Sequence, residues 1–82
     1  MKPGDLVRAV TWTDQYVTDD TDKIAAHGLA SLEHHQILDN SIGIVLGEPV
    51  NTSWAPGFRF VKWASFNGTV GWTYGIHLEV IQ

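Results

Sequence analysis

The stretch FRFVKWASFNGTVGWTYGIHLEVI, residues 58–81, predicts a β-hairpin, a short corner and a closing strand. Its turn signal is Asn67-Gly68, because both residues tolerate the positive φ angles of a type I′ turn. A two-residue turn there sets Trp63 opposite Trp72, and opposed residues share one face of a sheet. This register predicts a packed face formed by Val61, Trp63, Val70, Trp72 and Tyr74.

The rest of the chain supplies strands for this hairpin to pair with. Residues 6–10 and 41–47 have the apolar composition of strands, residues 75–78 predict a 3₁₀ turn, and residues 79–81 predict the last strand. Residues 13–40 are polar and acidic, with loosely helical apolar spacing from Asp22 onward. Two interpretations of this segment stay open, a short helix between residues 22 and 38 or a long irregular loop.

This order of elements is that of an SH3-like barrel. The opening KPGDLVR, the strand IGIVLG, VKW before the NG turn, and the ending GWTYGIHLEVI resemble small SH3-like barrel proteins of tailed bacteriophages, including phages of marine cyanobacteria. The resemblance covers residues 2–10 and 41–81. It implies a mainly β fold of about five strands, with residues 13–40 as a long insertion in the first loop. It supplies no catalytic residues, and most such proteins have no assigned function.

Composition limits the classes of protein that remain. Eighty-two residues predict one domain, residues 1–82, with a thin core that buries roughly 60% of the unfolded chain's surface. The net charge of −4 lies within residues 1–40 and no basic stripe is present, which argues against nucleic-acid binding. With no cysteine, no long apolar run and no leader-like segment, we expect a cytoplasmic protein that binds no membrane. For a phage protein this is the host cytoplasm or the virion.

The hairpin register leaves two phenylalanines unexplained by packing. If Val61 and Trp63 face inward, Phe58 and Phe60 face outward and form an apolar patch of the kind found at interfaces. A sharp bend in the strand, burying Phe60, is the alternative. Trp54, in a loop rich in proline and glycine, is the strongest single candidate for a partner contact. The predicted partner-binding residues are Trp54, Phe58, Phe60, Asp19, Asp20 and Asp22.

Other kinds of site have weaker support in the sequence. Trp12, Trp54, Trp63, Trp72 and Tyr74 could form an aromatic cage for methylated side chains, although aromatic residues in so small a domain are more often core. His27, His34 and His35 with the nearby aspartates match no metal-site spacing, so we expect no metal and no cofactor. No nucleophile has a plausible base, and we expect no catalytic residues and no enzyme activity.

The sequence therefore predicts a protein that acts through contact with another protein. The first hypothesis is a phage-type structural or assembly protein, either a minor virion component or an accessory protein directed at the host. Its partner is a second copy, a virion protein or a host protein, and open sheet edges would allow a homo-oligomer. The alternatives are a module that binds a small ligand or methylated side chain in an aromatic cage, and an accessory subunit of an enzyme or electron-transfer complex.

Overall fold

The fold is mainly β, as the sequence predicts. The computed structural model describes residues 1–27, 29 and 32–81, with His27 described by its backbone alone. In chain order the elements are β1 (Leu6–Ala9), β2 (Thr13–Val17), the helical turn η1 (Lys23–His27), β3 (Glu33–Ile37), β4 (Ile42–Val45), β5 (Val50–Asn51), β6 (Arg59–Ser65), β7 (Val70–Tyr74), the 3₁₀ turn η2 (Gly75–His77) and β8 (Leu78–Val80).

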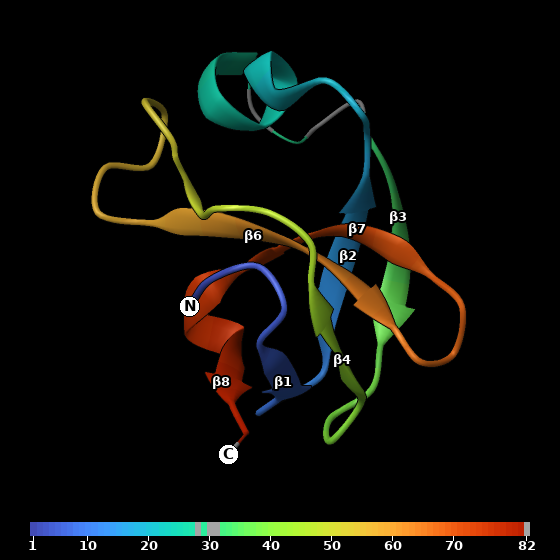
Figure 1. Cartoon of the computed structure of the whole chain (residues 1–82). Helices are drawn as coiled ribbons and strands as arrows, with labels where there is room; N and C mark the ends of the chain where they lie inside the picture. Colours follow the sequence, from blue (N-terminus) through green and yellow to red (C-terminus); the bar gives the residue numbers. More distant parts are fainter. Residues whose placement is uncertain (28, 30–31, 82) are drawn as a thin grey trace.

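The strands form one open antiparallel sheet. Seven of them follow the order β3-β2-β7-β6-β4-β1-β8 (Figure 1). The short strand β5 pairs with β6 beside this path. The sequence predicted about five strands, and the described residues form eight. The additional strands are β5 and the pair β2 and β3, which lie within the segment 13–40 that was expected to be an insertion. Five cross-strand pairs join β2 to β3, so this segment is part of the sheet.

Among the described residues of the segment 13–40, helical structure occupies only a small part, and residues 28, 30 and 31 of the region where a helix was considered lie outside the described residues. The turn η1 spans five residues, and β3 takes the second half of the region where a helix was considered. Figure 1 shows η1 at one end of the molecule, far from both chain termini. Across the described part of the chain, no helix combines the length and apolar character needed to cross a bilayer.

The hairpin β6–β7 forms, but its register differs by one residue from the prediction. Trp63 pairs with Gly71, and Lys62 pairs with Trp72. The turn is a three-residue loop, in which the Gly68 amide donates to the Ser65 carbonyl at 2.9 Å. Asn67 does not have a positive φ, because Asn40 is the only described residue other than glycine that does. Gly68 itself has φ +96°. Asn67 therefore does not enter a type I′ turn, and a single left-handed glycine closes the hairpin as a G1 bulge.

The shifted register divides the core between the two faces of β6 and β7. One cluster lies within the curved sheet and consists of Val7, Ala9, Ile37, Val45, Val61, Trp63 and Leu78. The other lies on the opposite face, under η1 and the segment 49–58, and its buried members are Ile24, Phe60 and Trp72. Trp63 and Trp72 therefore belong to different clusters, contrary to the sequence prediction, because pairs one residue apart point to opposite faces.

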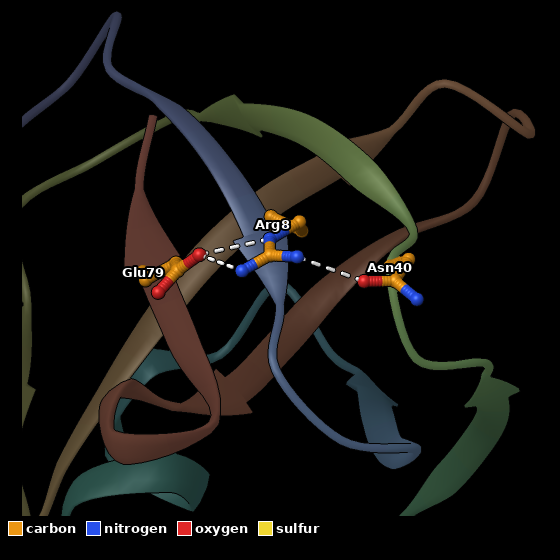
Figure 2. A network of polar contacts seen from close by, with 3 residues as sticks. All are labelled: Arg8, Asn40 and Glu79. Atoms are coloured by element: carbon orange, nitrogen blue, oxygen red, sulfur yellow. Dashed lines mark hydrogen bonds and ion pairs between the residues drawn. The ribbon is translucent and has the colours of Figure 1, made fainter. Parts of the chain in front are cut away.

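A polar network joins the first strand to the last (Figure 2). The Arg8 guanidinium on β1 donates to Glu79 Oε1 on β8, with 2.8 Å from Nε, and to Asn40 Oδ1, with 2.9 Å from Nη1. Asn40 lies in the turn before β4 with φ +66°, a conformation that asparagine tolerates better than most residues. The network therefore ties three chain segments together at one end of the sheet.

Candidate functional site

One face of β2 carries three side chains suited to binding. Trp12 comes directly before this strand, and Asp14 and Tyr16 follow it at alternate positions. Alternate residues of a strand share a face, while Thr13 and Gln15 between them are buried. The indole of Trp12 is 58% exposed, which is unusual for so large an apolar group.

These side chains line a hollow of about 360 Å³ together with Tyr74 and His77 from the end of β7 and η2. Thr11 and Thr13 complete its wall. The hydroxyl of Thr13 and Nδ1 of His77 share a hydrogen bond of 2.8 Å, which fastens the start of β2 to η2. We call this cavity the first hollow. It is built from two chain segments that lie far apart in the sequence.

A second hollow, of about 260 Å³, adjoins the first. It is lined by Ala55, Phe58, Tyr74, Ile76 and His77, so that Tyr74 and His77 belong to both hollows. Phe58 and Ile76 are 41% and 65% exposed. The ring of Tyr74 packs edge-on against Phe58, with centroids 5.7 Å apart, and lies 5.8 Å from His77. Together the two hollows form a continuous aromatic surface, the aromatic face.

A buried ring supports this aromatic face from below. Phe60 has no exposed surface, and its ring lies 4.2 Å from Tyr74, 5.7 Å from Trp54 and 6.3 Å from Tyr16, measured between ring centroids. Tilted and edge-on aromatic pairs at these separations are favourable beyond their buried area. Phe60 therefore fixes the positions of the rings that solvent reaches.

The electrostatics of the first hollow centre on Asp14. Burial raises the pKa of Tyr16 above its usual value of about 10, and the negative charge of Asp14 beside it raises that pKa further. The Asp14 carboxylate therefore lies near the Tyr16 hydroxyl. The hollow thus combines one carboxyl group with several aromatic rings.

The predicted contact residues on β6 and in the loop before it occupy different environments. Phe58 is exposed on the aromatic face, as predicted. Phe60 is buried, so it is unavailable for contact with a partner. Of the two interpretations that the sequence left open, the two-phenylalanine patch is wrong and burial of Phe60 is confirmed. The sequence correctly predicted that Phe60 lies on the same face of the strand as Lys62. This face is covered at Phe60 by η1 and the segment 49–58, which is why the side chain is buried. Trp54 is half-buried, and its indole donates to the Ile24 carbonyl at 2.8 Å.

The three predicted aspartates lie outside both hollows. Asp20 makes a local turn, in which its carboxylate accepts from the Asp22 amide at 2.9 Å. Asp19 is fully exposed and lies 3.7 Å from the Lys62 ammonium. These residues thus form the exposed turn ahead of η1, and the structure does not bring them to Phe58.

The aromatic cage considered from the sequence is not assembled as expected. Trp63 and Trp72 are buried, with their indole nitrogens donating to Thr73 Oγ1 and the Thr18 carbonyl. Trp12 and Tyr74 both line the first hollow, together with Tyr16 and Asp14. Among the described residues, no three histidine, aspartate or glutamate side chains lie close enough to hold a metal ion. The side chain of His27 lies outside that description.

Sequence reasoning named Trp12 only as a possible member of an aromatic cage, and it missed Asp14, Tyr16 and His77 as site residues. A signal for the first three was present, because TWTDQYV alternates large or charged residues with residues that pack inward. The acidic character of the segment that follows hid this short strand. His77 had no signal, since only the fold brings it to Thr13.

Comparison with known proteins adds no assignment. No protein-family model, curated protein or solved structure matches this chain. The fold and the aromatic face define it as a small, mainly β chain built on one antiparallel sheet with an exposed aromatic surface.

Proposed function

We propose that this chain is a small SH3-like domain that acts without catalysis, by binding an extended segment of a protein partner across its aromatic face. The observation that carries the proposal is the pair of adjoining hollows that share Tyr74 and His77. Exposed tryptophan, tyrosine and phenylalanine side chains in such hollows are typical of the residues that dominate binding energy at protein interfaces.

The strand order supports an SH3-like assignment. Strands β7-β6-β4-β1-β8 are consecutive neighbours in the sheet, and the 3₁₀ turn η2 connects β7 to β8. The last strand thereby returns beside the first. On this interpretation β2 and β3 are the arms of the long first loop, and β2 together with Thr11 and Trp12 before it carries half of the aromatic face.

The shape of the surface favours an extended partner segment over a compact one. Two hollows separated by one shared wall suit the side chains of a chain that lies across both of them. The resemblance to phage proteins makes a virion or host protein the expected partner. A second copy of this chain is the other, since β3 and β8 leave the sheet edges open.

Selection from a random peptide library tests this proposal. Peptides enriched on the immobilised wild-type protein are then measured against the double variant Phe58→Ser/Ile76→Ser. Phe58 and Ile76 are 41% and 65% exposed and belong to neither buried core cluster, so their replacement should leave the fold intact. We expect affinity to fall about tenfold or more, as for removal of an interface hot spot.

A matched control separates the aromatic face from apolar surface in general. Leu38 and Phe66 are 67% and 66% exposed and line neither hollow. The double variant Leu38→Ser/Phe66→Ser should bind the selected peptides as the wild type does. Failure to enrich any peptide, or an equal loss in both double variants, would contradict the proposed function.

A further inference from the structure

The first hollow combines aromatic rings with a carboxyl group that forms no ion pair with any of the described residues. The rings of Trp12, Tyr16 and Tyr74 line it, and Asp14 lies among them. Within the described part of the chain, the ion pairs are Arg8 with Glu79 and Lys62 with Asp19, so Asp14 takes part in none. Rings expose a negative π face, and a carboxylate carries a full negative charge, so both favour the same kind of guest.

The chain's own cations do not fill this hollow. All five lysine and arginine side chains belong to described residues, and none of them lines it. His77 lines it, with Nδ1 engaged by Thr13 at 2.8 Å. The negative charge of Asp14 is therefore left for a group that comes from outside the molecule.

We propose that the first hollow binds an alkylammonium group, carried by a lysine side chain of the partner and held most tightly when that group is N-methylated. This inference rests on the proposed function and names the chemistry that one half of the aromatic face recognises. Ring faces attract a methylated ammonium while its methyl groups fill the apolar space between them. The carboxylate of Asp14 supplies the charge that distinguishes such a guest from an uncharged side chain of the same shape.

The geometry fits a guest of this size. A hollow of about 360 Å³ lies at the small end of the range that ligand sites occupy. The neighbouring second hollow holds no carboxylate among its lining residues. A partner segment that crosses both would thus place its ammonium group against Trp12 and an apolar side chain against Phe58.

Nuclear magnetic resonance of the four indole N–H groups tests the proposal. The probes are a short peptide with a trimethyl-lysine, the same peptide with unmodified lysine, and the same peptide with the ammonium nitrogen replaced by carbon. We expect the trimethyl-lysine peptide to shift the Trp12 signal, which the variant Trp12→Phe identifies by its loss. The buried indole of Trp63 should not respond. The uncharged isostere should bind about tenfold more weakly.

Two variants with equal net charge separate a local effect from a general one. Asp14→Asn should weaken binding of the trimethyl-lysine peptide about tenfold. Asp39→Asn, which removes an exposed carboxylate outside the hollow, should leave binding unchanged. Equal binding of the uncharged isostere, or an equal effect of the two variants, would overturn the proposal.

The outcomes also distinguish this inference from the proposed function. Binding of library peptides that requires Phe58 and Ile76, but requires neither a cationic side chain in the peptide nor Asp14, would support the proposed function and overturn the ammonium assignment. Binding of free choline, with no response to any lysine-bearing peptide, would overturn the assignment to a protein partner. Weaker binding of unmodified lysine than of trimethyl-lysine supports the preference for the methylated group.

Discussion

Phe60 packs against three aromatic rings, two of which line the first hollow, although Phe60 itself is fully buried. Its ring lies between Tyr74, Trp54 and Tyr16, and it also packs in the cluster with Ile24 and Trp72. Thr73 acts in a similar way from the other face of β7. Its buried hydroxyl accepts from the Trp63 indole at 2.8 Å and donates to the Asp14 carbonyl at 3.1 Å. Core residues thus hold the site residues in place.

The hydroxyl of Tyr16 provides a prediction about alkaline pH. Because burial and Asp14 raise its pKa in the folded state, the folded protein keeps this proton at a pH where the unfolded chain releases it. The resulting stabilisation is fully present below the unfolded pKa, near 10, and is lost as the pH rises through the folded pKa.

The variant Tyr16→Phe keeps the ring and removes the proton. We expect its free energy of unfolding to fall less than that of the wild type across this alkaline window, as measured by urea denaturation at a series of pH values. In absorbance measurements of tyrosinate, the ionisation that the fold displaces above pH 10 in the wild type should be absent from the variant. Parallel losses of stability in both proteins would contradict the raised pKa.

At the scale of elements, the site depends on how closely β2 approaches β7. A Cβ atom on Gly71 would lie 2.4 Å from the Tyr16 carbonyl oxygen and 2.9 Å from Gln15 Cγ. Only glycine leaves enough room for β2 to cross at this point, where Tyr16 pairs with Trp72. The strand β2, which carries half of the aromatic face, can therefore lie this close to β7 because Gly71 has no side chain.

Replacing that glycine should disturb both stability and binding. Gly71 lies in ordinary β conformation, so Gly71→Ala introduces a steric clash without backbone strain. We expect a loss of about 1–3 kcal/mol in the free energy of unfolding, measured with denaturant, and displaced signals from Trp12. Gly47→Ala is the matched control, because its Cβ meets nothing within 4 Å. If Gly71→Ala proved as stable as this control, β2 would be able to shift at little cost, and the argument from close approach would fail.

At the scale of the whole molecule, the two ends of the chain meet in the sheet. β1 pairs with β8 through three residue pairs, and the Arg8 network lies across this junction (Figure 2). The Cα radius of gyration is 11.4 Å, close to the value of about 12 Å expected for a compact chain of this length. Since the core is divided between two small clusters, stability depends on joining distant segments.

The Arg8 network should contribute a small and salt-dependent part of that stability. Both Arg8 and Glu79 are partly exposed, so we expect Arg8→Ala to cost about 0.5–1 kcal/mol of unfolding free energy at low salt and less at high salt. A double-mutant cycle with Glu79→Ala measures the coupling between the two side chains directly. Zero coupling at low ionic strength would show that the pair contributes nothing.

The limits of sequence reasoning follow from particular elements. Composition and alternation predicted the strands β1, β4, β6, β7 and β8 and the turn η2, because each is specified locally by its own residues. The strands β2 and β3 were missed, because a polar, acidic segment can form strands when its neighbours supply the packing. The hairpin register was one residue off, because Asn67-Gly68 suits both a two-residue turn and a three-residue loop with a glycine bulge.

The sequence by itself therefore determined that this is a mainly β chain whose hairpin at residues 58–81 lies at its centre. It also placed Phe58 on the surface. The tertiary structure alone decided that Phe60 is buried and that Trp63 and Trp72 pack in different core clusters. It also decided that Trp12 and Asp14 line the same hollow as Tyr74. The physical reason is that exposure and site geometry depend on which distant segment covers a given face, and periodicity along one strand carries no information about that segment.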